Sequence, residues 1–420
     1  MIARIEALNY KCLHHINQRL LPFQVLVGPN ASGKSAFLDV VAFLGDLLRE
    51  GPQQAVLKRA QSLKELVWKG EGDEFELAIE LRLPEAFHGR GQNRGLGYTH
   101  CRYEVNVGID QSHGGVRSLS ENFFLMRNSR SPAVFQRSLF PQEWDVPKSI
   151  VLERYARMPA GWRKVVALTS EGKAYFRSET TDWNFPLRPG AQKAALSLVP
   201  EEEERFPVSN WARKVLTEGV QVLALNSVAM RQPCDPIGPR TFQPDGSNLP
   251  LVVRELQDKS DQQYRSWLNH LQTVLPDLIE LEAIERPEDR RLYLLATYAS
   301  GLKIPSWLIS DGTLRLLALT LLAYLPPADP VYLIEEPENG VHPRAMEAVF
   351  QSLSSVYAGQ VLLATHSPLI LGLAKPEQIL CFARTPSGAT DIVSGRAHPA
   401  LAEWKGQVNL GILYASGVLG

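Results

Sequence analysis

The sequence has few cysteines, almost no net charge and no long apolar run. Its four cysteines, Cys12, Cys101, Cys234 and Cys381, are scattered and form no Cys-x-x-Cys pair, which argues against a disulfide framework and a structural zinc site. The formal net charge is -1, so any contact with nucleic acid would require a local basic patch. These properties predict a globular, cytoplasmic protein.

Membrane segments are also missing from the sequence. The most apolar run, LRLLALTLLAYL at 314–325, is too short to span a bilayer and carries Arg315. The first 20 residues hold no apolar stretch that resembles a signal sequence. We therefore expect no membrane association.

Strand and helix patterns at both ends of the chain predict an α/β fold. FELAIELRL (75–83) and CRYEVNVGI (101–109) alternate apolar and polar residues, as half-buried antiparallel strands do. No sustained heptads occur, which argues against a long coiled-coil arm. We expect a mixed sheet with flanking helices, an antiparallel β subdomain and a helical insertion lobe. The expected divisions are 1–115, the first half of the main domain; 116–285, a partly helical insertion; and 286–420, the second half.

A phosphate-binding pattern follows the apolar strand predicted at QVLV (24–27). It reads G-x-x-x-x-G-K-S over Gly28, Pro29, Asn30, Ala31, Ser32, Gly33, Lys34 and Ser35. The glycines let backbone N–H groups converge on an anion, and the helix that follows adds its positive end. Lys34 would reach the β- and γ-phosphates, and the Ser35 hydroxyl would bind Mg²⁺. A plain glycine turn would not explain the order of strand, loop and helix.

Two carboxylates end a later apolar strand, in VYLIEEPENGVHP (331–343). In a nucleotide site Glu335 would hold Mg²⁺, and Glu336 would orient and deprotonate the attacking water. The plainer interpretation is a solvated acidic turn ended by Pro337.

His366 ends the next apolar strand, in VLLATHSPLIL (361–371). A lone histidine at such a position is usually structural. Because ligands of open α/β sheets collect at the carboxyl ends of strands, His366 becomes a candidate sensor of the γ-phosphate.

The polar residues Ser310, Asp311, Gly312 and Thr313 precede an apolar helix. Taken alone they form an ordinary N-cap, in which Ser310 or Asp311 accepts hydrogen bonds from backbone N–H groups. Their place between the phosphate-binding pattern and the acidic strand end suggests a second role.

In this order, the phosphate loop, ISDGT, LIEEPE and ATHSP resemble the ABC-type ATPase heads of the SMC, RecF and OLD group. The sequence is similar in particular to compact bacterial AAA-type ATPases of phage-defence systems, such as the Septu and PARIS ATPase subunits. The resemblance covers 1–110 and 300–385, and QPDGSNLPLVVREL (243–256) is similar to a RecF-like and OLD-like segment. The stretch 115–240 resembles no family that we can name.

The resemblance implies a role for each motif. Gly28 to Ser35 would be the Walker A motif, Glu335 the Walker B residue at a position where Asp is commoner, and Glu336 the catalytic glutamate. His366 would be the switch histidine, and 310–313 the ABC signature. The Q-loop glutamine cannot be chosen among Gln53, Gln54 and Gln61.

The same resemblance implies ATP, Mg²⁺ and a homodimer, or a higher oligomer. In such heads, Ser310 and the Gly312 N–H would contact the γ-phosphate held by Lys34 of the other copy. ATP binding would then close the dimer, and hydrolysis would open it.

The sequence also indicates where the effector of the ATPase would be encoded. OLD proteins carry a TOPRIM nuclease after the ATPase, but only 54 residues follow His366, with a single aspartate, Asp391. We therefore expect a separately encoded effector, such as a TOPRIM-like or HNH nuclease or a toxin.

One stretch, 127–164, is rich in basic residues with interleaved aromatics. The basic residues are Arg127, Arg130, Arg137, Lys148, Arg154, Arg157, Arg163 and Lys164. They suit either a DNA or RNA backbone surface or a folded subdomain with a solvated basic face.

Two functions remain open. The first is an ATP-hydrolysing switch that controls a separate effector in bacterial anti-phage defence. The second is a RecF-like or SMC-like DNA-binding ATPase of DNA repair or recombination.

Overall fold

The computed structural model describes residues 1–87, 97–110, 115–127, 136–153, 157–169, 171–188, 190, 192–326, 329–401 and 409–419. It divides the chain into two compact units. The first comprises 1–220, 376–404 and 419–420, and the second comprises 221–375 and 405–418. The unit boundaries differ from the predicted divisions at 115 and 285, because strands on both sides of residue 115 pair in one sheet.

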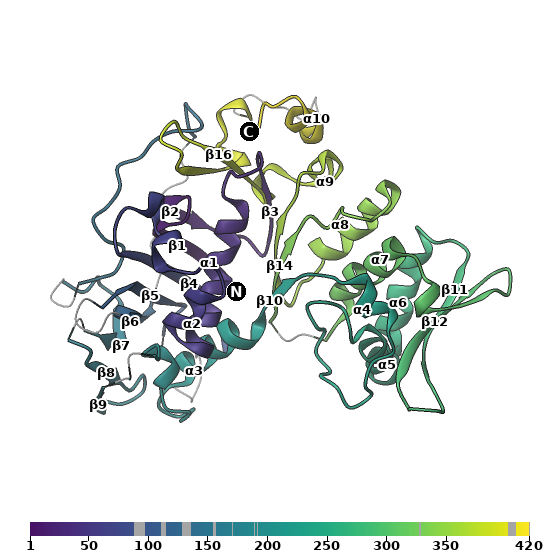
Figure 1. The fold of residues 1–420 in the computed structure, drawn as a ribbon, viewed down its shortest axis with the longest axis horizontal. Helices are drawn as coiled ribbons and strands as arrows, with labels where there is room; N and C mark the ends of the chain where they lie inside the picture. Colours follow the sequence, from purple (N-terminus) through teal and green to yellow (C-terminus); the bar gives the residue numbers. More distant parts are fainter. Residues whose placement is uncertain are drawn as a thin grey trace. The chain divides into compact units, whose positions relative to one another are not determined.

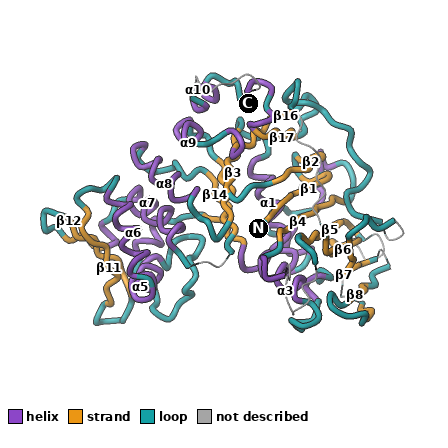
Figure 2. Tube along the Cα trace, turned by 180° about the vertical axis from the view of Figure 1, so that it is seen from behind, coloured by secondary structure: helices purple, strands orange, loops and turns teal. Residues whose placement is uncertain are grey.

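An eight-stranded antiparallel sheet forms a large part of the first unit. Figure 2 shows its successive strands side by side. In spatial order they are β2 (Leu13–Arg19), β1 (Ile2–Tyr10), β4 (Glu74–Arg82), β5 (His100–Ile109), β6 (Val116–Met126), β7 (Trp162–Leu168), β8 (Ala174–Arg177) and β9 (Asn184–Leu187). Strands β6 to β9 thus correct the expectation of a helical insertion beginning at residue 116, since they extend the sheet begun by β1 and β2.

Both faces of the central strands are buried, whereas alternation predicted one solvated face. Along β4 the apolar residues Phe75, Leu77, Ile79 and Leu81 are buried, but so are the polar residues between them, such as Glu80. The polar side chains of the sheet bind one another and an irregular segment at 149–152. Within that segment the Leu152 N–H donates to Glu104 at 2.8 Å and its carbonyl accepts from Asn122 at 2.9 Å.

Arg102 is the centre of this buried polar layer. Its guanidinium is 5 % exposed and binds three carboxylates: Glu6, Glu80 at 3.3 Å and Glu104 at 2.6 Å. Burial by itself lowers the pKa of Arg102, but the Glu6 and Glu104 carboxylates outweigh it and raise the pKa. One cation therefore compensates several buried anions.

Three more strands and three helices complete the elements of the first unit. Strand β3 (Phe23–Val27) pairs in parallel with β16 (Ile379–Arg384), which pairs with antiparallel β17 (Thr390–Ser394). The helices are α1 (Lys34–Glu50), α2 (Pro52–Leu57) and α3 (Pro207–Lys214). Helix α1 buries an apolar stripe that includes Phe37 and Phe43, and Phe43 packs against Tyr10 and Phe75. Helix α3 is followed by a π turn at 215–219 and by β10 (Val220–Leu223).

The second unit contains a parallel strand pair, a small antiparallel sheet and seven helices among its described residues. Its strands are β14 (Val331–Glu335), β15 (Gln360–Ala364), β11 (Leu278–Glu285), β12 (Leu292–Tyr298) and β13 (Lys303–Pro305). Its helices are α4 (Ser227–Arg231), α5 (Leu249–Lys259), α6 (Asp261–Gln272), α7 (Asp311–Leu321), α8 (Met346–Ser354), α9 (Pro368–Leu373) and α10 (Leu410–Ala415).

Helices α5 and α6 pack on β11, and α6 also contacts α7 (Figure 1). The Trp267 indole N–H donates to Thr320 at 2.9 Å and joins α6 to α7 inside the core. Helix α6 ends at Gln272, and the β11–β13 sheet that follows was not predicted. Within the described ranges, no helix combines the length and the apolarity that crossing a membrane requires.

The Arg102 network generates the first prediction. Replacing Arg102 with Met should lower the free energy of unfolding by about 3–5 kcal/mol, because buried Glu104 loses the cation that it binds and Glu6 and Glu80 are left to Arg4 alone. Chemical denaturation measures the change. The control is Arg82→Met at the exposed end of β4, which should change the free energy of unfolding by less than about 0.5 kcal/mol. A loss below about 1 kcal/mol for Arg102→Met would contradict the proposed role of the cation.

Candidate functional site

The predicted phosphate loop connects β3 to α1, and two of its glycines are required by close packing. Gly28 has φ 150°, and a Cβ there would lie 2.2 Å from the Phe382 carbonyl oxygen. Gly33 has φ 105°, and its Cβ would lie 2.2 Å from Thr390 Oγ1. The backbone therefore runs tightly against β16 and β17.

The start of α1 presents backbone N–H groups that no described side chain caps. Lys34 is buried, and its Nζ donates to the carbonyl oxygens of Gly28 at 2.7 Å and Pro29 at 3.0 Å. The ammonium group is thus folded over the loop, while Ser35 is exposed. A helix of 17 residues with such an N-terminus suits an anion.

Strand β17 holds the loop from the side. The Thr390 hydroxyl donates to the Ser32 carbonyl at 2.9 Å, and the Thr390 N–H donates to the Cys12 carbonyl at 3.0 Å. The Ser32 hydroxyl is buried and finds no hydrogen-bond partner in the described part of the chain. The N-terminus of α1, this hydroxyl and the folded Lys34 fit a phosphate. Sequence reasoning missed Thr390, which lies more than 350 residues from the loop that it supports.

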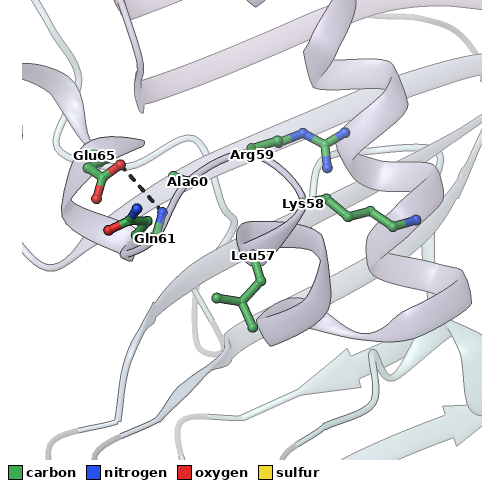
Figure 3. A pocket seen from close by; sticks show the side chains of 6 residues that line it. All are labelled: Leu57, Lys58, Arg59, Ala60, Gln61 and Glu65. Carbon is green, nitrogen blue, oxygen red and sulfur yellow. Dashed lines mark hydrogen bonds between the residues drawn. The ribbon is translucent and has the colours of Figure 1, made fainter.

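The three candidate Q-loop glutamines lie on or just after α2, and all are exposed. Gln61 lines an open depression together with Leu57, Lys58, Arg59, Ala60 and Glu65 (Figure 3). Arg59 and Lys58 extend toward α1, where Arg59 binds Asp39 at 2.7 Å and Lys58 binds Asp46 at 3.0 Å. Burial opposes the charge of Asp39, but Arg59 and Lys11 outweigh it and lower the pKa of that carboxyl. The basic residues here are engaged with carboxylates, and nothing selects one glutamine.

In the second unit, parallel pairing joins the predicted acidic turn to His366. Glu335 lies opposite Ala364 at the ends of β14 and β15, and the Glu336 N–H donates to the Ala364 carbonyl at 2.8 Å. His366 follows two residues later. The two strand ends therefore meet at one edge, as predicted.

Glu336 has an uncommon backbone conformation for a residue with a side chain. Its φ of 48° lies in the left-handed region, and the residue is exposed. Asn339 stabilises it, because its N–H donates to the Glu336 carbonyl at 3.0 Å and its amide donates to the Glu336 carboxylate. The turn thus presents the Glu336 carboxylate outward in a held orientation.

Glu338 connects the acidic turn to the histidine loop. Its Oε1 accepts hydrogen bonds from the Thr365 hydroxyl at 2.7 Å and the His366 N–H at 2.9 Å. Its Oε2 is buried without a hydrogen-bond partner among the described residues. Glu338 was assigned no role from the sequence, because its contacts depend on two strands meeting.

The SDGT stretch caps α7, as the plainer interpretation held. The Ser310 hydroxyl oxygen accepts from the Thr313 N–H at 3.2 Å, and Asp311 pairs with Arg231. A Cβ on Gly312 would lie 2.5 Å from the Gly340 carbonyl oxygen, so α7 begins in direct contact with the turn after β14. Ser310 itself is exposed.

The candidate residues therefore form two sets. Residues 28–35 belong to the first unit, whereas Ser310, Gly312, Glu335, Glu336 and His366 belong to the second. Among the residues that the structure describes, no group of three or more His, Cys, Asp or Glu side chains could hold a metal ion.

Several basic residues of 127–164 have partners inside the first unit. Arg137 binds Asp391 through two hydrogen bonds of 2.8 and 2.9 Å, and Arg163 donates to the Ser178 and Thr181 carbonyls. Lys164 lies over the Phe124 ring, and burial lowers its pKa. Arg130 and Arg154 lie outside the described residues. These contacts support a folded subdomain more than a nucleic-acid surface.

Comparison with known proteins places these motifs in a family. The protein-family model described as "AAA domain, putative AbiEii toxin, Type IV TA system" matches residues 162–372, half of the chain. That range includes Ser310, Glu336 and His366. No curated protein matches the chain.

Solved structures with the same fold include two SMC heads. One, bound to the C-winged helix domain of ScpA, is 14% identical with a TM-score of 0.53, covering 94% of this chain and 97% of that one. Another, with an extended coiled coil and bound to the C-terminal domain of ScpA derived from Pyrococcus furiosus, is 13% identical with a TM-score of 0.50 (94% and 96% coverage). The chain thus has the mixed α/β fold of SMC ABC-type ATPase heads, and it belongs to the AAA-domain family of putative AbiEii toxins of type IV toxin–antitoxin systems.

Proposed function

We propose that the chain is an ATP-hydrolysing switch that dimerises on ATP and controls a separate effector, a nuclease or a toxin, in bacterial anti-phage defence. The observation that carries the proposal is the edge at which Glu336 and His366 meet. There a strained glutamate is held by Asn339, and Glu338 holds the backbone of His366. Membership of an AAA ATPase family supports the reaction class.

In this proposal the loop from Gly28 to Ser35 binds the phosphates. Backbone N–H groups within 30–35 donate to phosphate oxygens, helped by the positive end of α1. Lys34 leaves the carbonyls of Gly28 and Pro29 to bind the β- and γ-phosphates. Ser35 and Glu335 hold Mg²⁺, which neutralises the negative charge that develops on the phosphates.

The residues of the second unit carry the hydrolysis. Water attacks the γ-phosphorus, forming one P–O bond while the bond to the β–γ bridging oxygen breaks. Glu336 accepts the proton of that water, and the products are ADP and phosphate. His366 donates a hydrogen bond to a γ-phosphate oxygen, where charge builds up.

The start of α7 binds the nucleotide that is held by another copy of the chain. Ser310 is exposed at this helix end, and the first N–H groups of a helix have no partner within it. Ser310 and the Gly312 N–H would bind the γ-phosphate held by Lys34 of a second copy. The ATPase site is then complete only in a dimer.

A role in defence is supported by the family description, which names a putative toxin of a toxin–antitoxin system. The SMC heads of similar fold were solved with a domain of another protein, ScpA, which supports a protein partner here. The same likeness favours a second candidate, a RecF-like or SMC-like DNA-binding ATPase. The internal contacts of Arg137, Arg163 and Lys164 weigh against it.

Glu336→Gln tests the hydrolytic role. The amide cannot accept the proton, so ATP turnover should fall at least about 100-fold while ATP binding persists and a closed dimer accumulates. Phosphate release, equilibrium binding and light scattering measure the three quantities. Glu347→Gln, an exposed glutamate of α8, is the matched control. Normal turnover in Glu336→Gln would end the assignment.

Mixing two inactive variants tests the shared site. Ser310→Ala and Lys34→Ala should each abolish most turnover, and a mixture should regain activity. With random exchange at equal amounts, half of the dimers are mixed and have one working site of two, so about a quarter of normal activity is expected. Failure to recover activity at any ratio, with exchange confirmed by differently tagged chains, would refute a site shared between copies.

Thr390→Val tests the support of the phosphate loop. Loss of the hydrogen bond to Ser32 should weaken ATP binding about 3- to 10-fold, with little change in turnover at saturating ATP. Thr390→Ser keeps the hydroxyl and should bind ATP nearly as the unaltered protein does. Equal binding by Thr390→Val and Thr390→Ser would show that the contact does not shape the loop.

A further inference from the structure

The helix near the end of the chain, α10, packs beside the histidine loop of the second unit. Asn409 caps α10, accepting a hydrogen bond from the Gly411 N–H at 2.7 Å. The neighbouring helix, α9, starts directly after His366, with Ser367 as its N-cap. Figure 1 shows α9 and α10 next to each other, and the two helices are in contact.

The contact between these helices is too close for a side chain at one position. A Cβ on Gly411 would lie 2.0 Å from the Pro368 carbonyl oxygen. On the other side, the Asn409 side chain lies against Gly372 of α9. This fit sets the position of α10 relative to the residues that follow His366.

This packing places the side chain of Tyr414 next to His366. The Tyr414 hydroxyl lies 3.2 Å from His366 Nδ1. We propose that Tyr414 is a positioning residue for His366, and that α10 thereby belongs to the ATP-hydrolysing site of the second unit.

The physical argument rests on the two nitrogens of a neutral imidazole, of which one donates and the other accepts a hydrogen bond. When the Tyr414 hydroxyl donates to Nδ1, the proton of the ring is on Nε2. Nε2–H is then a donor for an anionic oxygen, as the proposed function requires of His366. Without the phenol hydroxyl, part of the population carries the proton on Nδ1 and offers Nε2 only as an acceptor.

Glu338 contacts the backbone of His366, whereas Tyr414 contacts its ring. Its carboxylate accepts from the His366 backbone N–H, and it thereby fixes the main chain while Tyr414 fixes the ring. The histidine is therefore held by two elements of the second unit that lie far apart in the sequence, the turn after β14 and α10.

Tyr414→Phe removes the hydroxyl and keeps the ring. Since the inference rests on the proposed function, kcat for ATP should fall about 2- to 10-fold, the effect of losing one neutral hydrogen bond. KM for ATP and the melting temperature should stay unchanged. Ile412→Ser, whose side chain is 62% exposed on the same helix, is the control and should leave kcat unchanged.

A double-mutant cycle separates positioning from general support. In a His366→Gln background, Tyr414→Phe should cause no further loss, because the ring that it orients is gone. An equal loss in both backgrounds, or normal kcat in Tyr414→Phe, would overturn the proposal. Gly411→Ala should lower kcat in the same direction by displacing α10, and this loss should also vanish in the His366→Gln background.

A second measurement does not depend on turnover. Two-dimensional ¹H–¹⁵N spectra of histidine side chains distinguish the two tautomers, and the His366 signal is assigned by its absence in His366→Gln. We expect the Nε2–H form in the unaltered protein and a mixture in Tyr414→Phe; the same spectrum in both would overturn the inference. If the protein hydrolyses no ATP, the proposed function fails, while the tautomer still decides the role of Tyr414.

Discussion

The hydrogen bond from the Glu336 N–H to the Ala364 carbonyl joins the ends of two parallel strands, and the geometry of the candidate site in the second unit depends on it. It holds the chain at the point where Glu336 takes a left-handed conformation. It also sets the distance over which Glu338 reaches Thr365 and His366. Without this pairing, the acidic turn and the histidine loop would be separate loops without a common site.

In the first unit, the corresponding constraint is steric. The phosphate loop lies so close to β16 and β17 that two of its positions accept only glycine. Thr390 contributes both the steric limit at Gly33 and a hydrogen bond to Ser32. The residue after it, Asp391, accepts hydrogen bonds from Arg137, Trp144 and the Gln142 N–H, so the irregular segment at 136–153 supports β17. The loop is therefore held by segments from three distant parts of the chain.

The large sheet shows why polarity alone was a poor guide to exposure. Glu80, Arg102 and Glu104 alternate with apolar residues, which predicted a solvated face. In the structure they are buried, because Arg102 pairs with Glu80 on the neighbouring strand and with Glu104 on its own strand. That compensation depends on strand register, which residue spacing within one strand does not contain.

The local motifs were predictable from the sequence because short-range physics sets them. The phosphate-binding pattern between a strand and a helix, the N-cap at Ser310 and the strands ending at Glu335 and Ala364 all follow from neighbouring residues. The contacts of Glu338, Thr390 and Tyr414 were not predictable, and neither were the extension of the sheet through β6–β9 and the small sheet β11–β13. Each of these depends on contacts between residues far apart in the chain, and only the folded backbone decides which distant groups come within hydrogen-bond distance.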